Sequence, residues 1–142
     1  MQPVASVLHG PGEVPGLPFS SAVRVGDLLF LSGQIGDVPG TRQLAEGGIT
    51  GQTRQTLENI KAVLAFAGSS LDRAVKCTVF LADIQDFAAM NAVYATYFPK
   101  DPPARSTIAA KGLAGGARVE IECVAVAGGA TRLAAVRNGL LP

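Results

Sequence analysis

Tryptophan is absent from this 142-residue sequence, and charged, aromatic and histidine residues are scarce. Twelve basic residues face eleven acidic ones, for a formal net charge of +1, and the basic residues are scattered singly. This argues against nucleic-acid binders, which usually carry a basic face or stripe. A catalytic triad or a zinc hydrolase would depend wholly on His9, within a Pro- and Gly-rich N-terminus, and such termini are usually mobile. Both classes of hydrolase are therefore disfavoured.

Long apolar runs are also lacking. No segment approaches the roughly 20 apolar residues that span a bilayer. Residues 1–12 have neither the basic region nor the apolar region of a signal peptide. We therefore expect a soluble cytoplasmic protein that does not contact a membrane.

The two cysteines, Cys77 and Cys123, lie in separate apolar stretches. Neither has a cysteine or histidine nearby at a spacing that suits a metal ion. A buried thiol behaves as a small apolar group, and disulfides are rare in reducing compartments. We expect two buried free thiols and no metal site.

Hydrophobic residues make up 48% of the sequence, which excludes intrinsic disorder. The length fits one domain. We expect a single domain over residues 1–127 and a tail over 128–142, with a short helix near 132–137. Residues 1–18 carry four prolines and are expected to be irregular chain or an edge segment, because proline cannot donate to a sheet.

The pattern along the domain predicts ββαβαββ. Residues 22–25 and 28–31 flank Gly26-Asp27 and predict a hairpin. Apolar residues at 3–4 spacing predict a helix over 51–67, with Thr50 as N-cap and Gly68 just past its end. The further segments are a strand at 75–81, a helix at about 84–98, and strands at 104–111 and 118–127. Paired strands with helices between them favour an α+β fold, with an antiparallel or mixed sheet and both helices on one face.

The last two strands are predicted to form a second hairpin. If Lys111 pairs with Arg118, then Thr107 lies opposite Glu122, and Arg105 and Glu120 share the same face of the sheet. One interpretation is a solvated face with a cross-strand ion pair. The other is a ligand site, in which Arg105 binds a carboxylate and a glutamate acts as general acid or base. The pattern alone leaves both open.

Several motifs together resemble the RidA (YjgF) family over residues 15–127. They are residues 103–107 (PARST), 118–122 (RVEIE), 30–35 (FLSGQI), 52–60 (QTRQTLENI) and 79–83 (VFLAD), the last leading to Phe87 and Asn91. The resemblance implies a chorismate-mutase-like protomer. It also implies a homotrimer whose sheets form a central barrel, with ligand sites between the subunits.

By the same resemblance, the expected reaction is hydrolysis of reactive 2-imino acids, or their enamine tautomers, to 2-keto acids and ammonia, with no metal or cofactor. Arg105 would hold the substrate carboxylate, and Glu120 would position or activate water. Thr107 would lie where the ligand meets the strand. Ser32, with Gly33 beside it, and Asn91 would line the cleft.

The sequence departs from the family pattern at residues 17–19. Leu17-Pro18-Phe19 stands where the deaminases have Gly-Pro-Tyr, so Phe19 keeps the ring and loses the hydroxyl. This leaves room for another small acidic substrate, such as an aminoacrylate or an aminomuconate, or for a metabolite-binding protein without catalysis. The endoribonuclease label given to some family members finds little support in a neutral chain without a basic stripe. The low charge content fits a chain that covers apolar sheet surface with further copies of itself.

Overall fold

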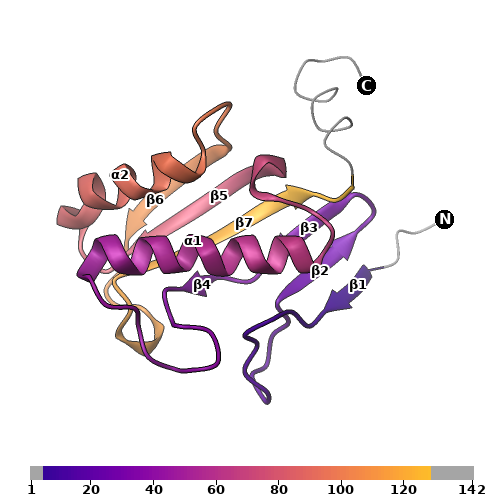
Figure 1. Ribbon diagram of the computed structural model, residues 1–142, viewed down its shortest axis with the longest axis horizontal. Coiled ribbons are helices and arrows are strands. Elements are labelled where there is room, and N and C mark those ends of the chain that lie inside the picture. The colour runs from indigo at the N-terminus through magenta and orange to yellow at the C-terminus, as the bar shows by residue number, and fades with distance from the viewer. Residues whose placement is uncertain (1–4, 129–142) are drawn as a thin grey trace.

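The computed structural model describes residues 5–128 (Figure 1). Two helices and seven strands, with three short 3-10 turns, make up this part of the chain. In chain order the strands and helices are β1 (Ala5–Leu8), β2 (Ala22–Val25), β3 (Leu28–Leu31), β4 (Gln34–Ile35), α1 (Gly48–Phe66), β5 (Ala74–Leu81), α2 (Phe87–Tyr97), β6 (Ala104–Ala109) and β7 (Val119–Val126). The predicted α+β class is confirmed.

One mixed sheet forms the back layer, in the order β1-β2-β3-β7-β5-β6, and β4 also pairs with β7. All pairs are antiparallel except β5 with β6, which run parallel on either side of the α2 crossover. Both helices lie on the same face of the sheet (Figure 1). The helices cover one face of the sheet, and residues 5–128 leave the other face open.

Helix α1 begins slightly earlier than the sequence suggests. Its N-cap is Gly47, with φ +101°, and Thr50 lies inside the helix rather than at its cap. Its end is as predicted, because Gly68 follows at φ +76° and Ser69 N donates to Leu64 O at 2.8 Å. The positive φ at Gly68 suits glycine, which has no side chain to clash there.

Helix α2 is preceded by a 3-10 turn over Ile84–Asp86 and is followed by the prolines at 99, 102 and 103, which cannot continue a helix. Arg118, just before β7, ties the start of α2 to the sheet. Its Nη2 donates to Asp86 Oδ1 at 2.9 Å and its Nε donates to Asp86 Oδ2 at 3.2 Å. This ion pair helps to fix the position of the N-terminal end of α2 relative to the start of β7.

The core lies between the helices and the covered face of the sheet. Alternate strand residues meet the helices there, as the strand period requires. The fully buried large side chains are Leu29, Leu57, Ile60, Leu64, Leu81, Met90, Ile121, Val79, Val119, Thr53, Thr56 and Cys77. The open face carries exposed apolar residues, including Phe30 at 44% and Ile108 at 52% exposure.

The predicted hairpin of the last two strands is wrong, because β5 lies between β6 and β7. Arg105 is level with Cys77 on β5, which is level with Cys123 on β7, so all three point toward the helices. Glu120 is level with Phe80 and faces the opposite way. Arg105 and Glu120 therefore lie on opposite faces of the sheet, and the expectation of a shared face is wrong.

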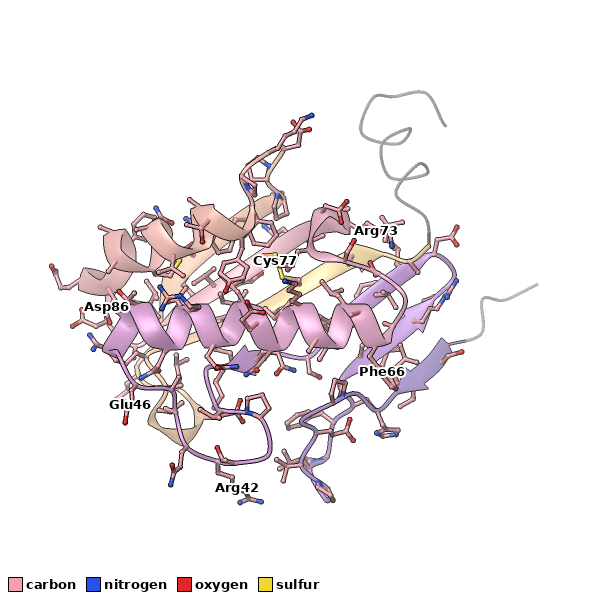
Figure 2. The ribbon with its side chains drawn as sticks, viewed as in Figure 1. Arg42, Glu46, Phe66, Arg73, Cys77 and Asp86 are labelled. Atoms are coloured by element: carbon pink, nitrogen blue, oxygen red, sulfur yellow. A yellow bond between two sulfur atoms is a disulfide. The ribbon has the colours of Figure 1, made fainter. Side chains whose placement is uncertain are left out.

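The expectation of free thiols is also wrong, because a disulfide joins Cys77 to Cys123. The two residues are register partners on β5 and β7, a pairing that no local pattern predicts. Figure 2 shows Cys77 between the sheet and the helical layer.

Two further expectations concern the ends of the chain, and the edge alternative for the N-terminal segment is confirmed over residues 5–8. Residues 5–8, within the segment expected to be irregular or an edge, form edge strand β1 on β2. The expected helix near 132–137 lies outside the described residues.

Candidate functional site

Arg105, on edge strand β6, lies against the aromatic face of α2. Its guanidinium carbon is 4.7 Å from the ring centroid of Tyr94 and 5.6 Å from that of Phe87. Such cation–π contacts attract and orient an arginine. Among residues 5–128, no carboxylate forms an ion pair with Arg105. The guanidinium is held in place while its charge remains available to a ligand.

A cavity of about 390 Å³ opens beside Arg105 and is called the α2 cavity below. It is lined by Asn91, Tyr94, Ala95, Phe98, Pro102, Pro103 and Arg105. Three buried polar atoms at or next to it have no hydrogen-bond partner in the described part of the chain: Asn91 Oδ1, Tyr94 OH and Thr107 Oγ1. Buried polar groups are normally satisfied, so these atoms are suited to meet a polar ligand or ordered water.

The pKa of the Tyr94 hydroxyl is raised, because burial disfavours the phenolate, although the nearby Arg105 opposes that effect. Tyr94 therefore remains a neutral hydrogen-bond donor at physiological pH. The sequence placed Tyr94 only on the apolar stripe of α2. Its spacing of three residues from Asn91, one helical turn, is the signal that links it to the same face as a site residue.

Glu120, on β7, lies on the open face next to the short strand β4, where it is the register partner of Ile35. Burial, and to a smaller extent the like charge of Glu122, raises the pKa of Glu120. No hydrogen bond or ion pair engages its carboxylate within the described residues. A β-carbon at Gly33 would collide with the Glu120 carboxylate, so the absent side chain is what lets Glu120 lie there.

A second cavity, of about 330 Å³, surrounds Glu120 and is called the β7 cavity below. It is lined by Pro11, Gly12, Glu13, Val14, Leu17, Phe19, Ser21, Ser32, Gly33, Gln34, Ile35, Asp37, Ala114 and Glu120. Ser32 stabilises its wall, because Ser32 Oγ donates to Ser20 O at 2.5 Å and Ser32 N donates to Ser21 O at 3.0 Å. These two bonds tie the end of β3 to the segment that carries Phe19.

The structure thus divides the residues singled out in the sequence into two groups. Phe19, Ser32 and Gly33 line the β7 cavity with Glu120. Asn91 lines the α2 cavity with Arg105, and Thr107 follows two positions along β6. Glu13 in the β7 cavity was not anticipated, because nothing in the sequence of the N-terminal segment indicates where it folds.

Three other features are not found among the described residues: a metal-binding cluster, a membrane-spanning helix and a catalytic triad. Residues 5–128 contain no group of three or more histidine, cysteine or acidic side chains arranged to hold a metal ion. Among those residues there is also no helix with the length and hydropathy needed to cross a bilayer. His9 bonds to Glu13 at 2.6 Å, and Ser21 also donates to Glu13, not to the imidazole, so no triad forms.

Comparison with protein families gives a match over residues 13–127 to the family described as endoribonuclease L-PSP. A 2-iminobutanoate/2-iminopropanoate deaminase of Mus musculus is 42% identical over 125 residues, which cover 88% of this chain and 91% of the relative. A RutC family protein of Pyrococcus horikoshii is 47% identical over 108 residues, which cover 76% of this chain and 86% of the relative.

Solved structures are similar over nearly the same span. RidA from an Antarctic Psychrobacter species superposes with a TM-score of 0.78 at 37% identity, covering 84% of this chain and 97% of that one. Escherichia coli TdcF with bound serine gives a TM-score of 0.76 at 34% identity, covering 88% and 98%. The fold and the sequence motifs therefore point to the same family.

Proposed function

This chain belongs to the RidA (YjgF) family, as its motifs predict, and we propose that it hydrolyses reactive 2-imino acids, or their enamine tautomers, to 2-keto acids and ammonia. The mouse relative, at 42% identity, carries the name of that activity. The observation that carries the proposal is a pair of uncompensated charges. Arg105 has no ion-pair partner among residues 5–128 and Glu120 has a raised pKa, and each lies beside a cavity.

The positions of these two residues support an assembly of several copies. Arg105 and Glu120 lie on opposite faces of one protomer's sheet, in different cavities. We infer that a second copy brings its Arg105 to the first copy's Glu120, and that three copies close the ring. Phe30 and Ile108 support this, because both are exposed apolar residues on the open sheet face. Burying such a face is the ordinary driving force of oligomer formation.

In the proposed site, Arg105 binds the substrate carboxylate through two parallel N–H···O bonds. Asn91, Tyr94 and Thr107 offer the unsatisfied polar atoms that orient the rest of the ligand. Ser32 and Gly33 shape the wall beside Glu120. Phe19 lies in that wall with 54% of its surface exposed and offers a ring without a hydroxyl.

The chemistry needs one base and one bound water. Water attacks the carbon of the protonated imine while Glu120 takes one of the water protons, and a neutral carbinolamine forms. Glu120 then returns that proton to the amine nitrogen. The carbinolamine hydroxyl loses its proton to the solvent as the C–N bond breaks, which releases ammonia and leaves the keto acid. A raised pKa suits a carboxyl that must both accept and donate a proton near neutral pH.

The proposed function is tested with imines that are generated enzymatically in the assay mixture. An amino-acid oxidase with catalase, or a pyridoxal-phosphate dehydratase, supplies short 2-imino acids, and ammonia release is compared with and without the protein. We expect clear acceleration over buffer, and none with Arg105→Ala. If the wild-type protein accelerates none of these imines yet binds a stable 2-keto acid, the chain is a metabolite-binding protein and the proposed activity fails.

A further inference from the structure

A second carboxylate, Glu13, lines the β7 cavity that contains Glu120. It comes from the N-terminal segment between β1 and β2, whereas Glu120 lies on β7. Only 22% of the Glu13 side chain is exposed. Its carboxylate is therefore part of the cavity wall rather than a freely solvated surface group.

Glu13 is held in place by its neighbours. Ser21 Oγ donates to Glu13 Oε2 at 2.5 Å, and His9 Nδ1 lies 2.6 Å from Glu13 Oε1. Gly10 N in turn donates to Ser21 Oγ at 2.9 Å, which fixes the serine. The hydrogen bonds from Ser21 and then His9 lower the pKa of Glu13, so this carboxyl is charged at neutral pH.

A carboxylate oriented in this way can still accept from a ligand, because its two oxygens offer about four acceptor positions and these neighbours occupy two. Hydrogen bonds from a cationic donor to a carboxylate are roughly twice as strong as bonds between neutral groups. Glu13 thus provides a preorganised site for a guanidinium or an ammonium.

The other residues that line the β7 cavity also favour a positively charged ligand group. Three carboxylates line the β7 cavity, those of Glu13, Asp37 and Glu120, and its lining contains no lysine or arginine among the described residues. The proposed assembly brings Arg105 of another copy to the Glu120 end of this cavity, and Arg42 lines the adjoining cavity that shares Glu13. Within one protomer the lining of the β7 cavity itself carries only negative charge, and a lining of one sign favours ligands of the other sign. Phe19 adds an exposed ring without a hydroxyl, a surface on which a cation can also lie.

The volume fits a long side chain. In one protomer the β7 cavity has a volume of about 330 Å³. An imino acid with a short alkyl side chain leaves much of that space unfilled. A chain that extends from the imine carbon near Glu120 toward Glu13 would fill it.

We propose that Glu13 selects, among 2-imino acids, those whose side chain ends in a cationic group such as a guanidinium or an ammonium. This rests on the function proposed above, with the substrate carboxylate on Arg105 of another copy and the imine carbon beside Glu120. Glu13 is then a specificity-determining residue. It binds the far end of the side chain and takes no part in the proton transfers.

The experiment uses two substrates of nearly the same shape. An amino-acid oxidase converts arginine and citrulline to their imines, which differ in carrying a guanidinium or a neutral urea group. We expect the wild-type protein to favour the arginine imine by about tenfold in kcat/KM, the scale of one charge-assisted hydrogen bond. Glu13→Gln should bring this ratio close to one. Glu46→Gln, an exposed carboxylate outside the β7 cavity, should leave the ratio unchanged.

The outcomes separate the two proposals. A wild-type ratio near or below one, with good activity on short alkyl imines, overturns the role of Glu13 and leaves the deaminase function standing. A ratio that persists in Glu13→Gln also overturns it. The wild-type ratio needs no variant, so misfolding of Glu13→Gln would not protect the proposal. If the wild-type protein accelerates the hydrolysis of none of the imines, the proposed deaminase function is overturned, and the proposed selectivity with it.

Discussion

The α2 cavity and the β7 cavity differ in almost every property that matters for a ligand. The α2 cavity is lined by one cation, Arg105, together with aromatic and proline rings. The β7 cavity is lined by three carboxylates and several apolar side chains. The first is built by one crossover, α2 and β6, whereas the second gathers residues from the N-terminal segment, β4 and β7.

Each cavity therefore holds a charge that the other lacks. A lone guanidinium can bind a carboxylate but cannot move a proton at neutral pH, because arginine does not deprotonate in proteins. A lone glutamate can move a proton but repels an anionic substrate. Under the proposed function, substrate binding and proton transfer belong to different faces of the protomer, and a second copy is needed to bring them together.

Removing the charge of the α2 cavity should have the largest effect. Arg105→Ala is expected to lower kcat/KM by about 10²–10⁴, the value of a bidentate charge-assisted pair. The kcat/KM of Arg105→Lys should lie between those of the wild type and Arg105→Ala, because lysine keeps the charge and loses the planar guanidinium. Ammonia release from freshly generated 2-iminobutanoate measures this. An Arg105→Ala variant with wild-type kcat/KM would remove Arg105 from the site.

Removing the proposed base of the β7 cavity, Glu120, should have the second largest effect on activity. Glu120→Gln keeps the shape and loses the proton acceptor, so kcat should fall by about a hundredfold or more. Binding of a stable 2-keto acid, followed by calorimetry, should change far less, because Arg105 still holds the carboxylate. If binding fails while kcat survives, the division of labour between the cavities is reversed.

Removing the aromatic ring that contacts Arg105 should have a smaller effect on activity. Tyr94→Leu removes the stacked ring and should raise KM by about tenfold, near the upper range of a desolvated cation–π contact. Tyr94→Phe keeps the ring but loses the hydroxyl, so it should restore only the part of the loss that is due to the ring. A thermal unfolding curve for each variant distinguishes lost packing from lost orientation. Equal KM values for the two variants would show that the ring does not orient Arg105.

The smallest change concerns the pH profile. Glu120 must be ionised to act as a base, so kcat/KM should fall as pH falls through its raised pKa. Glu122 contributes to that rise, after burial. Glu122→Gln should therefore lower the pKa of Glu120 and move the acid limb of the profile to lower pH. A limb that moves to higher pH, or stays fixed, would separate Glu122 from the titration.

Local sequence patterns were sufficient to predict most of the individual helices and strands. The period of α1, the Gly26-Asp27 hairpin of β2 and β3, and the proline stop after α2 all depend on neighbouring residues, and the structure agrees with them. Thr50 was wrong as a cap because glycines at 47 and 48 allow the helix to start earlier.

Strand pairing could not be predicted in the same way. Strands that follow each other in sequence usually pair, so β6 and β7 were expected to form a hairpin. Instead β5 lies between them, and a change of partner that shifts the pairing by one residue moves side chains to the other face. Arg105 accordingly faces α2, and Cys77 meets Cys123.

The site residues carried over from the family motifs fall into two coherent groups in the structure, but their roles stay predictions. Glu13 could not be anticipated, since its position depends on how an irregular segment folds back toward Ser21. The residue that we propose to set specificity is thus one that the sequence motifs do not reveal.

A mixing experiment tests the central claim, that each site takes Arg105 from one copy and Glu120 from another. Arg105→Ala and Glu120→Gln chains, each inactive alone, are co-expressed with different tags, and mixed assemblies are purified. Every mixed cyclic trimer, whether two-to-one or one-to-two, has both native residues in one of its three sites, so activity should recover toward about a third of wild type. A mixed assembly no more active than its two parents would place both residues in one protomer's site and contradict the account.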